Sequence, residues 1–209
     1  MTIGAYDGVH LGHQAVIRAT QAAAARFGGR TALVTFDPHP AYVLRPESAP
    51  KLLTDLEQKL DLLEACGVDT VVVVPFDLEA AQESAEEFVA RVVVDAARAK
   101  AVVVGADFHF GKARAGNVAL LRDLGGIHGF EVEGLQLLPK PDGTTEAVSS
   151  TAIRRALAAG DVTGAARHGV AAGTAVEAVV AVVAVEHVVP GEAVERVVAD
   201  AAGERVGAT

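Results

Sequence analysis

Two histidines spaced three residues apart, His10 and His13, are the side chains of this sequence best suited to chemistry on an anion. A few apolar residues and a glycine-containing turn precede them, and an amphipathic run over residues 15–27 follows. The start of a helix offers unpaired N–H groups and a positive dipole end. Imidazoles at that point can donate hydrogen bonds to phosphoryl oxygens, charged or neutral around pH 7. The turn therefore predicts a site for a polyphosphate.

A histidine turn of this kind has several possible explanations besides a phosphate site. A single histidine near a helix start is most often solvated or a capping residue. Two histidines at this spacing, with no cysteine or third histidine nearby, fall short of a zinc site. Gly4, Gly8 and Gly12 are spaced by four, which excludes the dinucleotide fingerprint, and the P-loop lysine is absent. What remains is a His-x-Gly-His turn between strand and helix, which resembles the hallmark of the nucleotidylyltransferase superfamily.

Three later stretches carry polar side chains that could join the same site. Residues 37–40 (DPHP) end an apolar run, although a stiff loop without a ligand explains them equally well. Residues 106–116, together with the preceding Gly105, combine three glycines, two bases and two aromatic residues, as in a flexible loop over an anionic ligand. Residues 148–155 supply hydroxyls at a helix start, with Arg154 one turn further on. Capping alone would explain Ser150 but not this gathering of hydroxyls and arginines.

The elements that must position these residues alternate between strand and helix. After a short first strand we expect strands at 30–36, 69–75, 101–105 and 130–138, and helices at 15–27, 54–66, from 84, 117–124, 150–160 and 161–168. Capping boxes at Thr54/Glu57 and Ser84/Glu87 begin two of the helices. This alternation predicts an α/β fold, a doubly wound, Rossmann-like parallel sheet with right-handed crossovers. Beyond residue 169 we expect one or two strands within 174–189 and a last helix at 192–202.

The composition excludes several classes of function. A formal net charge of −9 argues against a general nucleic-acid surface. The single cysteine, Cys66, excludes an internal disulfide, and the Ala/Val-rich run at 174–189 is too short and too charged for a membrane span. No charged-then-apolar leader precedes the histidine turn. We therefore expect a cytoplasmic protein with small-molecule partners, no nucleic acid and no membrane.

Five blocks in order resemble the bacterial FAD synthetases, specifically the FMN adenylyltransferase module of the bifunctional riboflavin kinase/FAD synthetase family. The blocks are 4–13, 35–40, 52–54 with Lys59, 104–111 and 149–154. The likeness covers roughly residues 3–168, which predicts a nucleotidylyltransferase domain at 1–168 and an extension of unknown role at 169–209. The family usually has phenylalanine in place of Tyr6, and a longer first strand.

The riboflavin kinase module of that family is not expected here. Its Pro-Thr-Ala-Asn signature is absent, and residues 169–209 are too few for its barrel. The extension is then a remnant, a cover for the sheet, or a contact between copies in a homo-oligomer.

The resemblance implies transfer of AMP from ATP to FMN, giving FAD and pyrophosphate. It implies Mg²⁺ held mainly by the ATP phosphates and water, with no direct protein ligand predicted. The catalytic residues would be His10, His13 and Arg154. ATP would be bound by Gly4, Tyr6, Asp7, Gly8, Gly12, Asp107, Ser150 and Thr151. FMN would be bound by Phe36, Pro38, Phe108, Phe110, Lys112 and Arg114.

Two alternatives stay open. One is a related nucleotidylyltransferase with another acceptor phosphate, such as pantetheine phosphate, nicotinamide mononucleotide or glycerol phosphate. The other is a non-catalytic paralogue that binds a flavin or nucleotide. The blocks at 35–40 and 104–111 favour the flavin acceptor, and the complete set of phosphate residues favours an enzyme.

Overall fold

The computed structural model describes residues 1–136, 147–166, 195–199 and 205–208. Its strands are β1 (Thr2–Ile3), β2 (Ala32–Asp37), β3 (Thr70–Pro75), β4 (Ala101–Gly105), β5 (His109–Phe110), β6 (Gly116–Asn117), β7 (Glu131–Leu135), β8 (Glu195–Ala199) and β9 (Arg205–Ala208). Its α-helices are α1 (Leu11–Arg26), α2 (Pro40–Leu44), α3 (Leu56–Ala65), α4 (Ala85–Phe88), α5 (Val118–His128), α6 (Ser150–Ala158) and α7 (Val162–Ala166). The 3₁₀ turns are η1 (Pro46–Ser48), η2 (Ala80–Gln82) and η4 (Lys112–Arg114), and a π-helix, η3 (Val89–Ala96), continues α4.

The main sheet has the strand order β7-β4-β1-β2-β3-β8-β9. All neighbours pair in parallel except β8 and β9, which are antiparallel. The expected α/β fold with a parallel sheet is confirmed. From β1 the chain builds outward to β2 and β3 on one side and to β4 and β7 on the other. Such a reversal of strand order leaves a crevice at the carboxyl ends of the strands, here those of β1 and β4.

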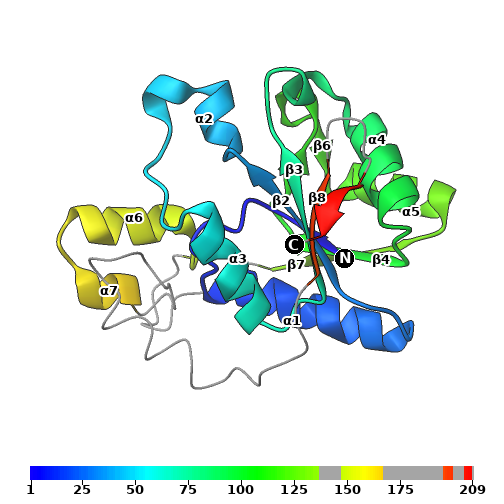
Figure 1. Cartoon of the computed structure of the whole chain (residues 1–209), viewed down its shortest axis with the longest axis horizontal. Coiled ribbons are helices and arrows are strands. Elements are labelled where there is room, and N and C mark those ends of the chain that lie inside the picture. The colour runs from blue at the N-terminus through cyan, green and yellow to red at the C-terminus, as the bar shows by residue number, and fades with distance from the viewer. Residues whose placement is uncertain (137–146, 167–194, 200–204, 209) are drawn as a thin grey trace.

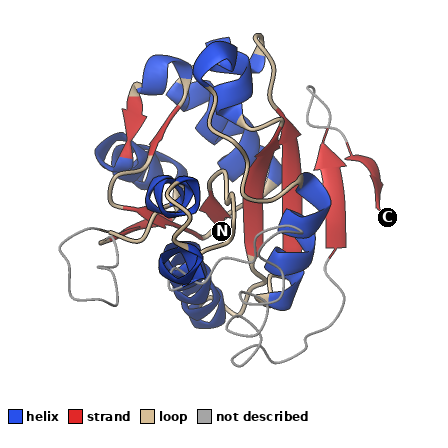
Figure 2. Ribbon diagram, turned by 90° about the vertical axis from the view of Figure 1, so that its left-hand side faces the viewer, coloured by secondary structure: helices blue, strands red, loops and turns tan. Residues whose placement is uncertain are grey.

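Helices cover both faces of the sheet because neighbouring strand residues point in opposite directions. Leu33 and Val71 pack with residues of α1 and α3 on one face. Val34 and Val102 pack with residues of α4, η3 and α5 on the other. Figure 1 shows these two helix layers, and Figure 2 shows the strands between them. Burial on both faces explains the nearly unbroken Val-rich runs.

Two helix starts differ from expectation. α1 begins at Leu11 instead of residue 15, which makes His10 its N-cap. α3 is capped by Asp55 and Gln58, so the expected Thr54/Glu57 box is wrong by one position. The Thr54 hydroxyl is occupied by longer-range contacts, described below. The box at Ser84 and Glu87 is confirmed, with both of its hydrogen bonds present.

The C-terminal prediction is also corrected. Residues 195–199, expected within a helix, form β8, which pairs with β3 from Thr70↔Glu195 to Val73↔Val198. The local sequence suits a helix, but it contains β-branched residues, and pairing with the edge of β3 overrides local preference. The elements expected at 174–189 and the helix end near His168 lie outside the described residues. Within the described residues, no helix is long and apolar enough to cross a membrane.

Candidate active site

The histidine turn leads from β1 into α1 at the carboxyl edge of the sheet. The His13 backbone N–H donates to Nδ1 of His10 over 3.3 Å, so the N-cap of α1 is itself a histidine. An accepting Nδ1 carries no proton, which leaves the His10 proton on Nε2. Tyr6 and Val9 hold positive φ angles of 52° and 36°. Such conformations are costly for these residue types and often mark functional turns.

The two imidazoles stack, with ring centroids 3.7 Å apart and planes 16° from parallel. Tyr6 lies beneath them, 4.8 Å from the His13 ring. The Nδ1 atom of His13 is inaccessible to solvent and has no hydrogen-bond partner among the described residues. Burial, together with the neighbouring His10, holds the pKa of His13 well below its usual value. His13 is therefore neutral at pH 7 without ligand, and one of its ring nitrogens is buried without a hydrogen bond from the described residues.

Asp7 joins this turn to two distant segments. Its Oδ1 accepts hydrogen bonds from the backbone N–H groups of Leu53 and Thr54 over 2.9 and 3.1 Å and from the Thr54 hydroxyl over 3.3 Å. Its Oδ2 forms an ion pair with Arg154. The backbone oxygen of Asp7 accepts from the Ser150 hydroxyl over 2.9 Å. Residues separated by more than a hundred positions thus meet at one buried carboxylate.

The N-termini of α1 and α6 converge on this point. Ser149 caps α6, its Oγ accepting from Ala152 N–H over 3.2 Å. A Cβ at Gly12 would lie 3.1 Å from the His10 ring and 3.4 Å from the Val148 carbonyl. Glycine therefore permits the close approach of the two helix starts. Two positive dipole ends therefore face the site, where the charge of Arg154 is paired with Asp7.

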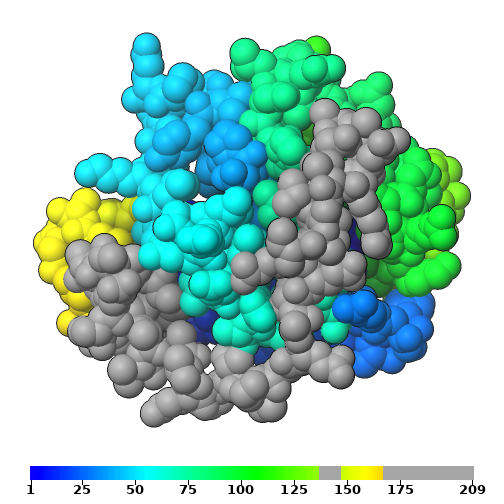
Figure 3. All heavy atoms as spheres, viewed as in Figure 1, coloured from blue at the N-terminus to red at the C-terminus, as the bar shows by residue number. Residues whose placement is uncertain are grey.

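A cavity of about 650 Å³ adjoins the histidine turn at Gly4 and Ala5. Charged side chains and five phenylalanines line it, the latter being Phe36, Phe76, Phe88, Phe108 and Phe110. Phe108 and Phe110 stack at 5.3 Å, and Phe36 meets Phe76 edge-on at 5.8 Å. Figure 3 shows a notch between the segment carrying α2 and the green segments opposite, from which the lining residues come. The volume and the lining suit a flat, largely apolar ring system.

The predicted flavin residues divide between this cavity and its surroundings. Phe36, Phe108, Phe110 and Arg114 line it, together with the ATP candidates Gly4 and Asp107. Pro38 and Lys112 are exposed and are not among the lining residues. Thr151 is also exposed, at the start of α6.

The loop expected to be flexible is anchored to α4. β5 and β6 pair within it, and the Lys112 N–H donates to the Glu83 carbonyl over 2.8 Å. A Cβ at Gly111 or Gly116 would come within 2.6 or 2.7 Å of Ala85, so glycine permits this packing. The loop therefore forms a fixed wall of the cavity.

Sequence reasoning omitted several residues of this region from the site. His39 lines the cavity and caps α2, its Nδ1 accepting from Ala41 N–H over 3.1 Å. Burial lowers the pKa of His39. Lys59 is buried and donates to the Phe36 carbonyl over 3.2 Å, and burial lowers its pKa also. His39 carried a signal in its Pro-framed turn, whereas Phe76 and Phe88 carried none.

Among the residues that the structure describes, no group of three or more His, Cys, Asp or Glu side chains could hold a metal ion. Asp7 is occupied by protein donors, whereas the exposed Asp107 lines the cavity and accepts no hydrogen bond through its side chain from the described residues.

The chain is similar in sequence to known proteins. Residues 1–152 match the sequence profile described as FAD synthetase. The bifunctional riboflavin kinase/FMN adenylyltransferase of Escherichia coli K12 is 37% identical over 158 residues, covering 76% of this chain and 50% of that protein. Its namesake from Pseudomonas fluorescens is 40% identical over 160 residues, with 77% and 50% covered. The chain spans about half the length of the curated relatives it matches.

A solved structure has a similar fold. The macrolide-efflux protein from Streptococcus pneumoniae superimposes with a TM-score of 0.68 at 27% identity. The superposition covers 80% of this chain and 55% of that one. The described core therefore has a solved counterpart over most of the chain.

Proposed function

The chain belongs to the FAD synthetase family, and from that premise we propose that it is an FMN adenylyltransferase. It transfers AMP from ATP to the phosphate of FMN and releases pyrophosphate. The observation that carries the proposal is the position of the stacked His10–His13 pair: it lies at two converging helix N-termini and beside an aromatic cavity.

The phosphate side of the reaction needs positioning and charge stabilisation. A phosphate oxygen of FMN attacks the α-phosphorus of ATP, and the bond to the bridging oxygen of pyrophosphate breaks. Negative charge then grows on the leaving pyrophosphate. His10 can donate from Nε2, and the neutral His13 stacked on it would take up a proton near a polyphosphate. Ser150 and Arg154 approach from the opposite helix.

The acceptor side needs an apolar slot next to the phosphates. Phe36, Phe108 and Phe110 supply flat surfaces on which an isoalloxazine ring can stack. The basic side chain of Arg114, on the loop at 106–116, lines the cavity as well. It would bind the FMN phosphate. This juxtaposition favours a flavin over the smaller acceptors of related enzymes.

Mg²⁺ would enter with ATP. The described residues suit an ion that keeps its phosphate and water ligands, with Asp107 as the available carboxylate. The ion neutralises phosphate charge when bound. Three further points stay predictions: a cytoplasmic location, self-association, and a role for residues 169–209 separate from a domain at 1–168.

The test is incubation of the purified protein with FMN, ATP and Mg²⁺, followed by chromatography of the flavins. CTP in place of ATP, and riboflavin in place of FMN, are parallel reactions. FAD formed only from FMN and ATP supports the proposal, and omission of Mg²⁺ should abolish it.

Other results would redirect the proposal. Absence of FAD with turnover of pantetheine phosphate, nicotinamide mononucleotide or glycerol phosphate would favour another acceptor. Binding of FMN or ATP with no product would favour a non-catalytic protein.

A further inference from the structure

The carboxylate of Asp7 is fully occupied by the protein. It is 4% exposed, and its two oxygens accept three hydrogen bonds from Leu53 and Thr54 and one ion-pair contact from Arg154. A carboxylate has about four lone-pair positions. Asp7 thus has no remaining capacity for a ribose hydroxyl or a metal ion, although it contacts Ser150 and Arg154, two of the residues proposed to bind phosphate.

Arg154 is the counterpart of this carboxylate. Its Nε donates to the Lys51 carbonyl over 2.6 Å, and its Nη2 contacts Asp7 Oδ2. Its third nitrogen, Nη1, has no hydrogen-bond partner within the described ranges. Two fixed nitrogens define the plane of a guanidinium, so the direction of the third is fixed as well.

The same aspartate also locates the helix that carries Arg154. The Ser150 hydroxyl donates to the Asp7 carbonyl oxygen over 2.9 Å, which ties the first turn of α6 to the histidine turn. The Thr54 hydroxyl in turn accepts from Gly8 N–H over 3.1 Å. Three chain segments are therefore held in one arrangement around residue 7.

We propose that Asp7 is a positioning residue that aims Arg154 and the start of α6 at the phosphates of the nucleotide, without touching the nucleotide itself. The proposal rests on the proposed function for its substrate. Its physical basis is preorganisation: an arginine held by a carboxylate needs no reordering when charge develops, whereas an unpaired one must be ordered by the ligand.

Asp7→Asn is the variant that isolates this role. The amide keeps the size of the carboxylate and an oxygen that can accept from the N–H groups of Leu53 and Thr54. It places an NH₂ group against Arg154 and so removes the ion pair. We expect kcat/KM for ATP in FAD formation to fall about 100-fold, the loss typical of a displaced catalytic group. The KM for FMN and the far-UV circular dichroism should stay unchanged.

The decisive experiment is a double-mutant cycle that combines Asp7→Asn with Arg154→Ala. If Asp7 acts through Arg154, the double variant is within about twofold of Arg154→Ala alone, because the aspartate has nothing left to position. Multiplicative losses would overturn the proposal, and so would an Asp7→Asn variant with wild-type ATP kinetics.

Asp69→Asn is the matched control at the other edge of the sheet. The Asp69 carboxylate accepts from the Thr31 N–H and hydroxyl, both over 2.6 Å, and so also ties two segments together. We expect this variant to lose stability while FAD formation stays at the wild-type rate. An equal loss of activity there would mean that any broken carboxylate network has the same effect, which contradicts a specific role for Asp7.

Binding of ATP alone, measured by calorimetry over the same cycle, separates this proposal from the proposed function. Non-additive binding losses in a protein that makes no FAD would support Asp7 as a positioning residue and reject FMN as acceptor. FAD formation by the wild type with additive losses would reject the role of Asp7 and leave the function standing. Failure to bind ATP would reject both.

Discussion

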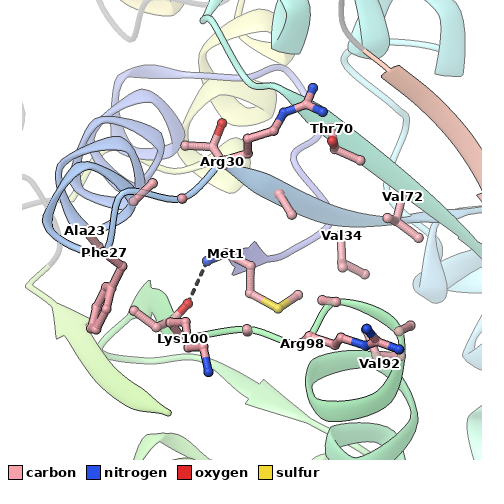
Figure 4. Close-up of a pocket in the computed structure, with 18 residues that line it drawn as sticks. Met1, Ala23, Phe27, Arg30, Val34, Thr70, Val72, Val92, Arg98 and Lys100 are labelled. Atoms are coloured by element: carbon pink, nitrogen blue, oxygen red, sulfur yellow. Dashed lines mark hydrogen bonds between the residues drawn. The ribbon is translucent and has the colours of Figure 1, made fainter.

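The carboxyl and amino edges of the sheet are built from similar parts but differ in what they can bind. The carboxyl edge has the cavity of about 650 Å³ beside the histidine turn, and the amino edge has one of about 460 Å³ around Met1 (Figure 4). Each edge has an aspartate, Asp7 or Asp69, that ties two segments together. Each also holds cationic groups, with Arg30, Arg98 and Lys100 lining the amino cavity.

The direction of the helices separates the two edges. The N-termini of α1 and α6 meet at the carboxyl edge, whereas Phe27, at the C-terminal end of α1, lines the amino cavity. A helix C-terminus presents carbonyl groups and a negative dipole end. The cations of this edge also find carbonyl acceptors outside the helices: the Met1 ammonium donates to the Ala101 carbonyl over 2.6 Å and Arg30 to the Asp69 carbonyl over 3.3 Å. Helix polarity, more than cavity size, thus selects the edge for anion chemistry.

The largest expected effect is at His13. His13→Ala removes a group that faces developing charge, so kcat for FAD formation should fall by about 10²–10³-fold with little change in melting temperature. Arg98→Ala, at the amino cavity, is the control and should keep the wild-type kcat. A His13→Ala enzyme with unchanged turnover would remove the histidine pair from the mechanism and abolish the functional contrast between the edges.

The next largest effect is expected from the phenylalanines that line the cavity at the carboxyl edge. Phe108→Ala should raise the KM for FMN about tenfold, because a lost aromatic stacking contact costs about 1–1.5 kcal/mol. The KM for ATP should stay the same. Phe27→Ala, at the amino edge, should alter neither constant. A change in the ATP constant alone would place the adenine, not the flavin, against Phe108.

Both edges bury a group that would otherwise be cationic, so both contribute to the pH dependence of stability. Burial lowers the pKa of the Met1 amino group from 8.0 to about 6. Burial and His10 lower the pKa of His13 from 6.5. The unfolded chain then binds more protons than the native one, so stability falls as pH falls.

These two losses occupy different pH windows. The loss from Met1 amounts to about 2 kcal/mol between pH 8 and 6. The loss from His13 begins below 6.5. Urea unfolding of His13→Gln should retain the first loss and lack the second, and ATP should reduce the second only. Identical pH profiles for wild type and variant would contradict a buried neutral His13.

The smallest effect is expected from filling the amino cavity. Val72 lines it, and Val72→Ile adds one methylene to that space. The free energy of unfolding should rise by up to about 0.8 kcal/mol, with FAD formation unchanged. A loss of activity in this variant would show that the amino cavity is coupled to the carboxyl edge.

Much of the fold followed from local pattern. Buried parallel strands are continuously apolar, and the runs at 69–75 and 101–105 have this pattern and form β3 and β4. The histidine turn was recognisable because strand, glycine and helix follow one another within a few residues. Such features depend on neighbours in sequence, which is the information that a single sequence holds.

What the sequence could not give depends on distant contacts. Thr54 was assigned to a helix cap because Glu57 follows at the right spacing, yet its hydroxyl contacts Gly8 and Asp7, 46 and 47 positions away. The sequence predicts a phosphate contact for Arg154, but nothing near it in the chain indicates its partner Asp7, 147 positions away. The strand at 195–199 likewise depends on the exposed edge of β3. In each case tertiary contact outweighed local preference.

The most direct test of the account is the fate of labelled phosphate at the carboxyl edge. The protein is incubated with FMN, Mg²⁺ and ATP labelled at either the α- or the γ-phosphorus, and the products are separated. The account predicts that α-label appears in FAD and γ-label in pyrophosphate. Flavin without α-label, or flavin carrying γ-label, would contradict AMP transfer at this site.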